Sequence, residues 1–120
     1  MPKKCLVIST ATDLVRVAPD KIVYISSDGN YCNLMLTDNE TRLITFQLGQ
    51  VEAMIEEQLG PEKIMFARIG RGLIINSNYI YYINIQSQKL ILSDNDHFTH
   101  TVSASKDALK LLKERLEKEK

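Results

Sequence analysis

Two arginines and two glycines lie close together in the middle of the chain, in the stretch Phe66-Ala67-Arg68-Ile69-Gly70-Arg71-Gly72. The planar guanidinium of arginine donates hydrogen bonds in a fixed fork that suits phosphate groups and the edge of guanine. Glycine lets the backbone turn tightly and approach a ligand closely. An apolar run, residues 73–75, follows at once and predicts a buried strand that holds this basic loop in place. The stretch is therefore the first candidate for a recognition surface.

Polar and basic residues elsewhere add candidate contacts. Asn30 ends a turn signal and Tyr31 and Asn33 follow it; asparagine side chains can pair with the edge of adenine. Lys106 and Lys110 lie on the predicted C-terminal helix, on or beside the face away from its leucines. If these elements meet on one side of a sheet, the loops can enter a groove of DNA while the lysines hold phosphates. The alternative is a set of polar loops with no common role.

Signals for an enzyme or a metal site are weak. His97 and His100 lie in a polar turn beside two aspartates, but no third or fourth metal ligand is placed nearby, so a solvated turn is the simpler interpretation. Cys32 has no neighbouring base that would make it a nucleophile. Three tyrosines are open to two interpretations, base stacking or ordinary sheet packing: Tyr79, Tyr81 and Tyr82. We therefore predict no enzyme activity, no cofactor, no bound metal and no small-molecule substrate.

Length and composition indicate a globular protein. The chain has 120 residues, of which 44% are apolar and 25% charged, so we predict a single domain over residues 1–120. No apolar run approaches the length of a membrane span, and the N-terminal apolar patch is too short for a signal peptide. Two cysteines are too few for a disulfide framework. We expect a cytoplasmic protein that does not bind membranes.

The distribution of charge says more than its total. The chain has 15 basic and 15 acidic residues, and this zero balance by itself argues against nucleic-acid binding. Residues 63–93 contain no acidic residue, however, whereas residues 38–62 contain six acidic residues and Arg42 as their single basic residue. This segregation predicts a dipolar surface with one positive face. The alternative is chance together with a solvated acidic helix.

Hydrophobic spacing predicts a mainly β fold with two helices. Alternating and β-branched runs predict strands at residues 1–8, 15–17, 21–25, 31–37, 43–46, 73–75, 79–85, 89–92 and 98–102, with turns at 26–30 and 38–40. A helical period from Leu48 to Leu59 ends at Gly60-Pro61, and its glutamates, Glu52 among them, are expected to face water. A terminal helix with a leucine stripe follows a serine cap, Ser103 or Ser105. The result is a mainly antiparallel β domain with one inserted short helix and one C-terminal helix.

The order of these segments resembles the LytTR family of DNA-binding domains. Residues 22–31 read Ile-Val-Tyr-Ile-Ser-Ser-Asp-Gly-Asn-Tyr, similar to the family opening I-x-Y-I-x-x-x-G-N-Y. Residues 66–76 are similar to the family block F-x-R-I-H-R-S-x-I-V-N. A Val-Ser pair then precedes the terminal helix, as in the family. The resemblance covers about residues 18–116, and the blocks in this order are more specific than any block alone.

The resemblance implies three small antiparallel sheets with a short helix, and loops that contact successive major grooves of double-stranded DNA. Family members commonly recognise paired direct repeats in promoters, bend the DNA and carry a phosphoacceptor receiver domain, for which these 120 residues have no room. By position, Arg68 and Arg71 match the arginines of the middle block, with Arg71 reading a base and Arg68 contacting phosphate or flanking bases. Asn30 to Asn33 match the first DNA-facing loop, and Ser103 to Lys106 match the last. Asn76 is expected to be structural.

Three departures from the family pattern bear on function. Gly70 stands where the family usually has histidine, Gly72 where serine is usual, and Ala104 where an arginine often reads a base. Ser105 and Lys106 are expected to compensate at the last loop. The prediction is a sequence-specific transcriptional regulator that can self-associate on DNA. The alternative is a protein-interaction module on the same fold with weakened DNA binding.

Overall fold

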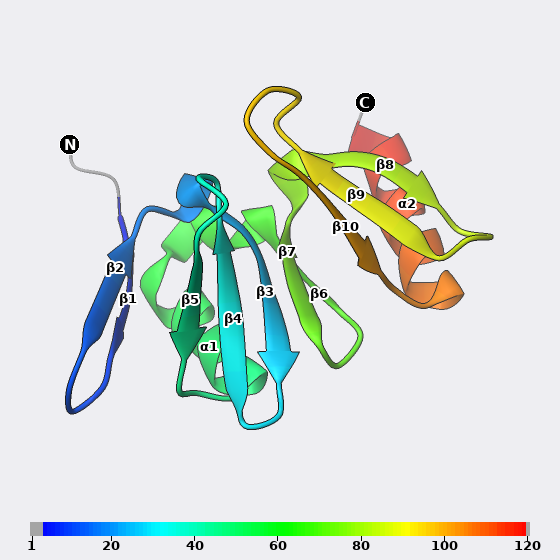
Figure 1. Ribbon diagram of the computed structural model, residues 1–120. Helices are drawn as coiled ribbons and strands as arrows, with labels where there is room; N and C mark the ends of the chain where they lie inside the picture. Colours follow the sequence, from blue (N-terminus) through cyan, green and yellow to red (C-terminus); the bar gives the residue numbers. More distant parts are fainter. Residues whose placement is uncertain (1–3, 120) are drawn as a thin grey trace. The chain divides into compact units, whose positions relative to one another are not determined.

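The computed structural model describes residues 4–119. The chain forms two compact units, residues 1–77 and residues 78–120 (Figure 1). Each has buried apolar residues of its own. Between residues 4 and 119, no helix combines the length and the apolar character needed to cross a membrane.

The first unit consists, over its described residues, of antiparallel strands and one α-helix. The strands are β1 (Leu6–Ser9), β2 (Leu14–Val17), β3 (Ile22–Asp28), β4 (Tyr31–Leu36), β5 (Thr41–Ile44), β6 (Phe66–Ile69) and β7 (Leu73–Asn76). Helix α1 spans Leu48–Gln58. Short 3-10 helices at Pro19–Lys21 and Gly60–Met65 join β2 to β3 and α1 to β6. β1 and β2 pair with each other, and the other strands form a separate sheet.

The five-stranded sheet has the order β5-β4-β3-β7-β6, and its neighbouring strands are antiparallel. β3 is central, and its Ser26 lies opposite Leu73 of β7. Because β3 ends where β7 begins, the turn between β3 and β4 and the turn between β6 and β7 lie at one edge of the sheet (Figure 1). The two turns, at residues 29–30 and 70–72, therefore lie at the same end of the strands, and we call this end of the sheet the turn edge. The Ser27 N–H donates to the Gly72 carbonyl there, over 2.9 Å.

One face of this sheet carries the core of the first unit. Ile25 of β3 lies between Leu34 and Ile74 on the neighbouring strands, and all three are buried. Val51 and Ile55 of α1 belong to the same buried cluster, and α1 lies against this face (Figure 1). Burial of each such side chain contributes about 1.5–3 kcal/mol. The four-residue spacing of the apolar side chains on α1 thus fixes the helix on the sheet.

A glutamine fastens the β1–β2 hairpin to α1. The Gln58 side chain donates from Nε2 to the Val7 carbonyl over 2.9 Å and accepts from the Val7 N–H over 2.8 Å. Leu6 and Ile8, on either side of Val7, are buried in the core cluster. Helix and hairpin are therefore joined by both polar and apolar contacts.

The second unit is a three-stranded antiparallel sheet with a helix. Its strands are β8 (Ile80–Asn84), β9 (Lys89–Ser93) and β10 (Thr99–Ser103), in the order β10-β9-β8, and α2 spans Lys106–Glu119. α2 contacts β8. Leu90 and Leu92 alternate on β9 and are buried, as are Leu109 and Leu112 of the predicted leucine stripe. This unit therefore has its core between the sheet and α2.

The structure confirms the mainly β class with small antiparallel sheets, an inserted helix and a C-terminal helix, and it corrects several boundaries. The predicted turn at 26–30 is wrong over Ser26 to Asp28, which belong to β3; Ser26 pairs with strands on both sides, and this pairing overrides the turn-forming residue types. The strand predicted at 43–46 begins and ends two residues earlier, because β5 pairs directly after the 38–40 turn. Of the strand predicted at 1–8, residues 1–3 lie outside the described residues, and β1 begins at Leu6.

Candidate nucleic-acid interface

The turn between β6 and β7 is built on two glycines. Gly70 has a φ of +63°, a backbone conformation that L side chains rarely adopt. At Gly72 a Cβ atom would lie 3.2 Å from Ser27 Oγ, tighter than most real contacts. The Gly72 carbonyl also accepts the hydrogen bond from β3. Glycine at these two positions therefore suits the left-handed backbone at residue 70 and the close packing of residue 72 on β3.

The two arginines of this stretch differ in their surroundings. Arg68 lies on β6, not in the turn as its glycine-rich neighbours suggested. Its Nε donates to the Gly70 carbonyl over 3.0 Å, and its two Nη atoms donate to Glu52 Oε1 over 2.8 Å and to the Arg71 carbonyl over 2.9 Å. Arg71 lies in the turn and is exposed. Its guanidinium makes no hydrogen bond or ion pair to any residue from 4 to 119, so it is available to a partner.

The turn between β3 and β4 is shorter than predicted. It comprises Gly29 and Asn30, whereas Tyr31 and Asn33 already belong to β4. Asn30 Oδ1 accepts a hydrogen bond from Gln47 Nε2 over 3.3 Å. Tyr31 is 48% exposed beside this turn, while Asn33 is half-buried two residues further along the strand. The structure thus brings Asn30, Tyr31 and Arg71 to the turn edge, whereas Asn33 lies further along β4, away from the turn.

Two residues at this site were missed by the sequence analysis. Gln47 caps α1 reciprocally with Gln50, and its own N–H donates to Gln50 Oε1 over 2.8 Å. The glutamine pair three residues apart, just before an apolar run, was a readable signal for this cap. Glu52 was expected to face water but is half-buried and pairs with Arg68. No local signal indicates that pair, because its members are 16 residues apart.

Two ion pairs join the acidic and the basic segments that are separated along the sequence. Glu52 binds Arg68 over 2.8 Å, and Glu56 binds Lys63 over 2.9 Å. In both pairs an acid of the 38–62 segment neutralises a base of the following segment. Packing of α1 next to β6 therefore mixes charges that are separated along the sequence, and Arg71 keeps an unpaired charge within the described part of the chain.

The predicted contacts of the second unit lie around the start of α2. Ser105 Oγ accepts from the Ala108 N–H over 3.1 Å, which confirms Ser105 as the cap of this helix. Lys106 and Lys110 are exposed, and their spacing of four residues puts them on one helix face. Neither ammonium group has a partner among residues 4–119. Lys113, by contrast, pairs with Glu117 over 3.0 Å.

Other chemically interesting side chains are occupied or buried. Cys32 is fully buried, and burial raises the pKa of its thiol while the charge of Arg68 opposes this rise. Tyr79 packs edge-on against Phe98, with ring centroids 5.1 Å apart. Tyr81 and Tyr82 of β8 are exposed, at 61% and 44%. Tyr79 thus fits the sheet-packing interpretation, whereas the other two are not packed in the core.

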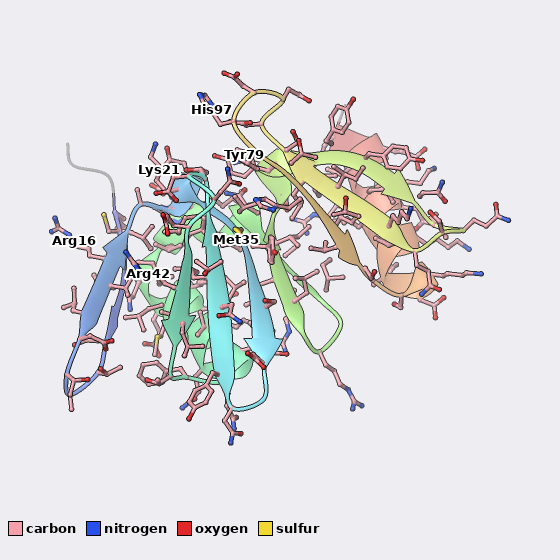
Figure 2. All side chains as sticks on the ribbon, in the orientation of Figure 1. Arg16, Lys21, Met35, Arg42, Tyr79 and His97 are labelled. Carbon is pink, nitrogen blue, oxygen red and sulfur yellow. The ribbon has the colours of Figure 1, made fainter. Side chains whose placement is uncertain are left out.

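His97 stabilises the turn between β9 and β10, where Figure 2 labels it. Its Nδ1 lies 2.9 Å from Asp94 Oδ2, and its Nε2 lies 3.5 Å from Asp96 Oδ2. The bond to Asp94 and the charges of Asp96 and Asp94 raise the pKa of His97 from its ordinary value of 6.5. Burial would raise the pKa of Asp94, but hydrogen bonds from His97 and from three backbone N–H groups lower it. In the described part of the chain, no three His, Cys, Asp or Glu side chains gather as a metal site would need.

This pair predicts a pH dependence of stability. The folded pKa of His97 lies above the unfolded value, so protonated His97 stabilises the fold below about pH 6.5, and this contribution is lost as pH rises through the folded pKa. Melting temperatures measured from about pH 5.5 to about pH 8.5 should therefore fall more for the unmodified protein than for a His97→Gln variant. Identical pH profiles would show that the pair contributes nothing. The lowered pKa of Asp94 acts only at more acidic pH, outside this window.

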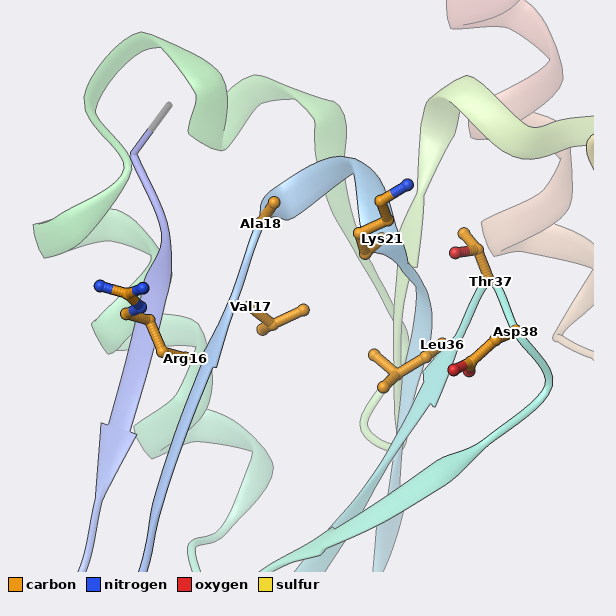
Figure 3. A pocket seen from close by; sticks show the side chains of 7 residues that line it. All are labelled: Arg16, Val17, Ala18, Lys21, Leu36, Thr37 and Asp38. Carbon is orange, nitrogen blue, oxygen red and sulfur yellow. The ribbon is translucent and has the colours of Figure 1, made fainter. Parts of the chain in front are cut away.

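A cleft of about 410 Å³ lies in the first unit away from the turn edge, beside the end of β4, and is lined by Arg16, Val17, Ala18, Lys21, Leu36, Thr37 and Asp38. Figure 3 shows Val17 and Leu36 pointing toward one another, whereas Arg16 points to the other side of β2. None of the residues predicted to contact DNA lines this cleft. The turn edge therefore remains the candidate site of the first unit.

Small antiparallel sheets with one inserted helix and one C-terminal helix define a mainly β class of domain. Comparison with known proteins agrees: the profile of the LytTr DNA-binding domain matches residues 12–117, and the chain belongs to the LytTR family of DNA-binding domains. A similar solved structure is described as the LytTr DNA-binding domain of a methyl-accepting/DNA response regulator from Bacillus cereus, with 21% identity, a TM-score of 0.65 and coverage of 96% of this chain and 98% of that one. No curated protein matches. The family is a class of DNA-binding domains and not a class of enzymes.

Proposed function

We propose that this protein is a sequence-specific regulator of transcription that binds double-stranded promoter DNA through the turn edge. The observation that supports this most is the difference between Arg68, which is hydrogen-bonded within the protein, and Arg71, which is not. The turn is fixed by hydrogen bonds from β3 and from Arg68, and it leaves the Arg71 guanidinium unpaired among the described residues. On a turn that is already held in place, such a guanidinium can donate two hydrogen bonds to the edge of guanine in the major groove.

The neighbouring turn supplies the second contact of the proposed site. Asn30 Oδ1 already accepts from Gln47, so the Asn30 Nδ2 group is left to donate to a base or phosphate oxygen. Tyr31 is exposed beside it and offers a ring and a hydroxyl. Asn33 is half-buried, and we assign it to supporting the turn rather than to contacting DNA.

The second unit is proposed to contact DNA around the start of α2. Lys106 and Lys110 have free ammonium groups, within the part of the chain that the structure describes, and would hold phosphates. Ser105 caps the helix through its Oγ, so its hydroxyl hydrogen remains available as a donor. In this proposal the loops of the two units occupy successive major grooves, and two copies of the protein bind a paired direct repeat. The protein would act in the bacterial cytoplasm.

Selection of bound fragments from a random duplex DNA pool at near-physiological salt tests this function. Enrichment of a paired repeat would support a site-specific regulator. Binding without any sequence preference, or no binding, would contradict it and favour the protein-interaction module. Salt dependence separates the two, because DNA binding weakens steeply with salt through counterion release and an apolar protein interface does not.

Lys110→Ala is expected to weaken binding to every DNA sequence by the same factor, because a lysine on phosphate carries no sequence information. The slope of log K against log salt should become shallower by about 0.9, the value for one phosphate contact. Fluorescence anisotropy on the selected site and on a scrambled duplex measures both effects. Lys113→Ala is the matched control and should change the slope less, because Glu117 already pairs with Lys113. A loss confined to the selected site would contradict a phosphate role.

A further inference from the structure

Arg68 is positioned to act on the turn rather than on DNA. On β6 it lies opposite Ile74, which is buried on the face that carries α1. From there its guanidinium reaches Glu52 of α1 over 2.8 Å. Its side chain is 29% exposed, and all three nitrogens of the guanidinium donate to acceptors within the protein.

The two carbonyl contacts of Arg68 lie on either side of Arg71. The Gly70 carbonyl belongs to the peptide plane before Arg71, and the Arg71 carbonyl belongs to the plane after it. Arg68 binds the first over 3.0 Å and the second over 2.9 Å. Because a residue's backbone direction is set by its two flanking peptide planes, one guanidinium fixes both soft dihedrals of Arg71. The direction in which the Arg71 side chain leaves the turn is fixed with them.

Glu52 holds the guanidinium in this place. Glu52 Oε1 accepts from Arg68 Nη1 over 2.8 Å, while Nε and Nη2 of the same guanidinium donate to the turn. Charge-assisted hydrogen bonds of this kind are roughly twice as strong as neutral ones. Arg68 is thus held between α1 and the turn, and the turn is tied to α1 as well as to β3.

We infer that Arg68 and Glu52 are positioning residues that set the direction of Arg71, and that Arg68 does not itself contact DNA. The inference rests on the proposed function, in which Arg71 reads a base. In this inference Arg71 contacts DNA, and Arg68 orients Arg71. It also assigns a role in DNA recognition to an acidic residue, which electrostatics alone would count as unfavourable near phosphate.

The sign of the Glu52→Gln effect tests the inference. If Glu52 were only a negative charge near DNA, its neutralisation would strengthen binding. As a positioning residue, its neutralisation should weaken binding to the selected site by about ten-fold, the usual size for coupled contacts. Glu57→Gln is the matched control, because Glu57 is exposed on the same helix and has no partner among residues 4–119. Glu52→Gln binding that equals or exceeds that of Glu57→Gln would overturn the inference.

Substitution of Arg68 separates positioning from direct contact. Arg68→Lys keeps the positive charge but loses the planar fork, so it should bind the selected site about as weakly as Arg68→Ala. In an Arg71→Ala background, Arg68→Ala should cause no further loss of sequence preference, because it acts through Arg71. Full binding by Arg68→Lys, or additive losses in the double variant, would show that Arg68 touches DNA itself.

A measurement on the DNA-free protein keeps this test apart from that of the proposed function. The amide NMR signals of Gly70, Arg71 and Gly72 should shift in Glu52→Gln and stay in place in Glu57→Gln. Unchanged signals in Glu52→Gln would overturn the inference whatever the protein binds. If the signals shift but the protein has no DNA sequence preference, the proposed function is wrong, and Arg68 and Glu52 still position the turn.

Discussion

Replacing Arg71 with alanine is expected to weaken binding to the selected DNA site by about 1–3 kcal/mol and to relax the preference at one base position. The guanidinium of Arg71 is unpaired within residues 4–119 and lies in a turn held from two sides. A bidentate contact to guanine would therefore form without breaking any bond in the described protein or first ordering the turn. Fragment selection repeated with the variant reports the base preference, and titration of the original site reports the affinity.

Arg42→Ala is the control for the loss of charge. Arg42 is exposed on β5, an edge strand of the same sheet (Figure 2), and its loss changes the net charge by the same amount. It should leave the base preference intact. If Arg71→Ala binds the same sites with the same affinity as the unmodified protein, Arg71 has no role in recognition, and the turn edge loses its main support.

Asn76→Ala is expected to lower the free energy of unfolding by about 1–3 kcal/mol, the cost of a buried polar group that loses its partner. Asn76 is fully buried at the end of β7, and its Nδ2 donates to the Ile22 carbonyl over 3.0 Å. A longer contact of 3.5 Å reaches the Pro19 carbonyl. Alanine removes the donor to the Ile22 carbonyl of β3 and to the Pro19 carbonyl. Urea denaturation followed by circular dichroism measures the change.

Asn30→Ala gives the opposite pattern and serves as the comparison for Asn76→Ala. Asn30 is exposed at the turn edge, so its loss should change stability by no more than about 0.5 kcal/mol while weakening binding to DNA. Asn76→Ala, studied well below its melting temperature, should keep the full base preference. A folded Asn76→Ala protein without that preference would make Asn76 a DNA ligand instead of a structural residue.

Much of the fold was predictable because its signals are local. Alternating apolar residues marked most strands, and the three- and four-residue spacing of apolar residues from Leu48 to Leu59 marked α1. Gly60, with a φ of +58°, follows the end of α1 as its residue type predicted. Errors arose where pairing with distant strands decided the structure. The serines of β3 have turn-forming character, yet β4 and β7 flank them and keep them in the sheet.

In the candidate site, too, some features follow from local residue types and others from contacts between distant parts of the chain. The residue types in residues 66–76 indicated an arginine- and glycine-based recognition turn, and they indicated a structural role for Asn76, because composition and spacing are properties of the chain alone. They placed both arginines on DNA, with Arg71 reading a base, and did not predict that the Arg68 guanidinium binds Glu52 and the turn of its own chain. Their difference depends on which side of β6 faces α1 and on Glu52, which lies 16 residues away along the chain. The sequence by itself therefore determined which groups are present. Only tertiary packing decided that Arg68 is bound to its own chain and that Arg71 has no partner among residues 4–119, because a hydrogen-bond partner far along the chain is chosen by the fold.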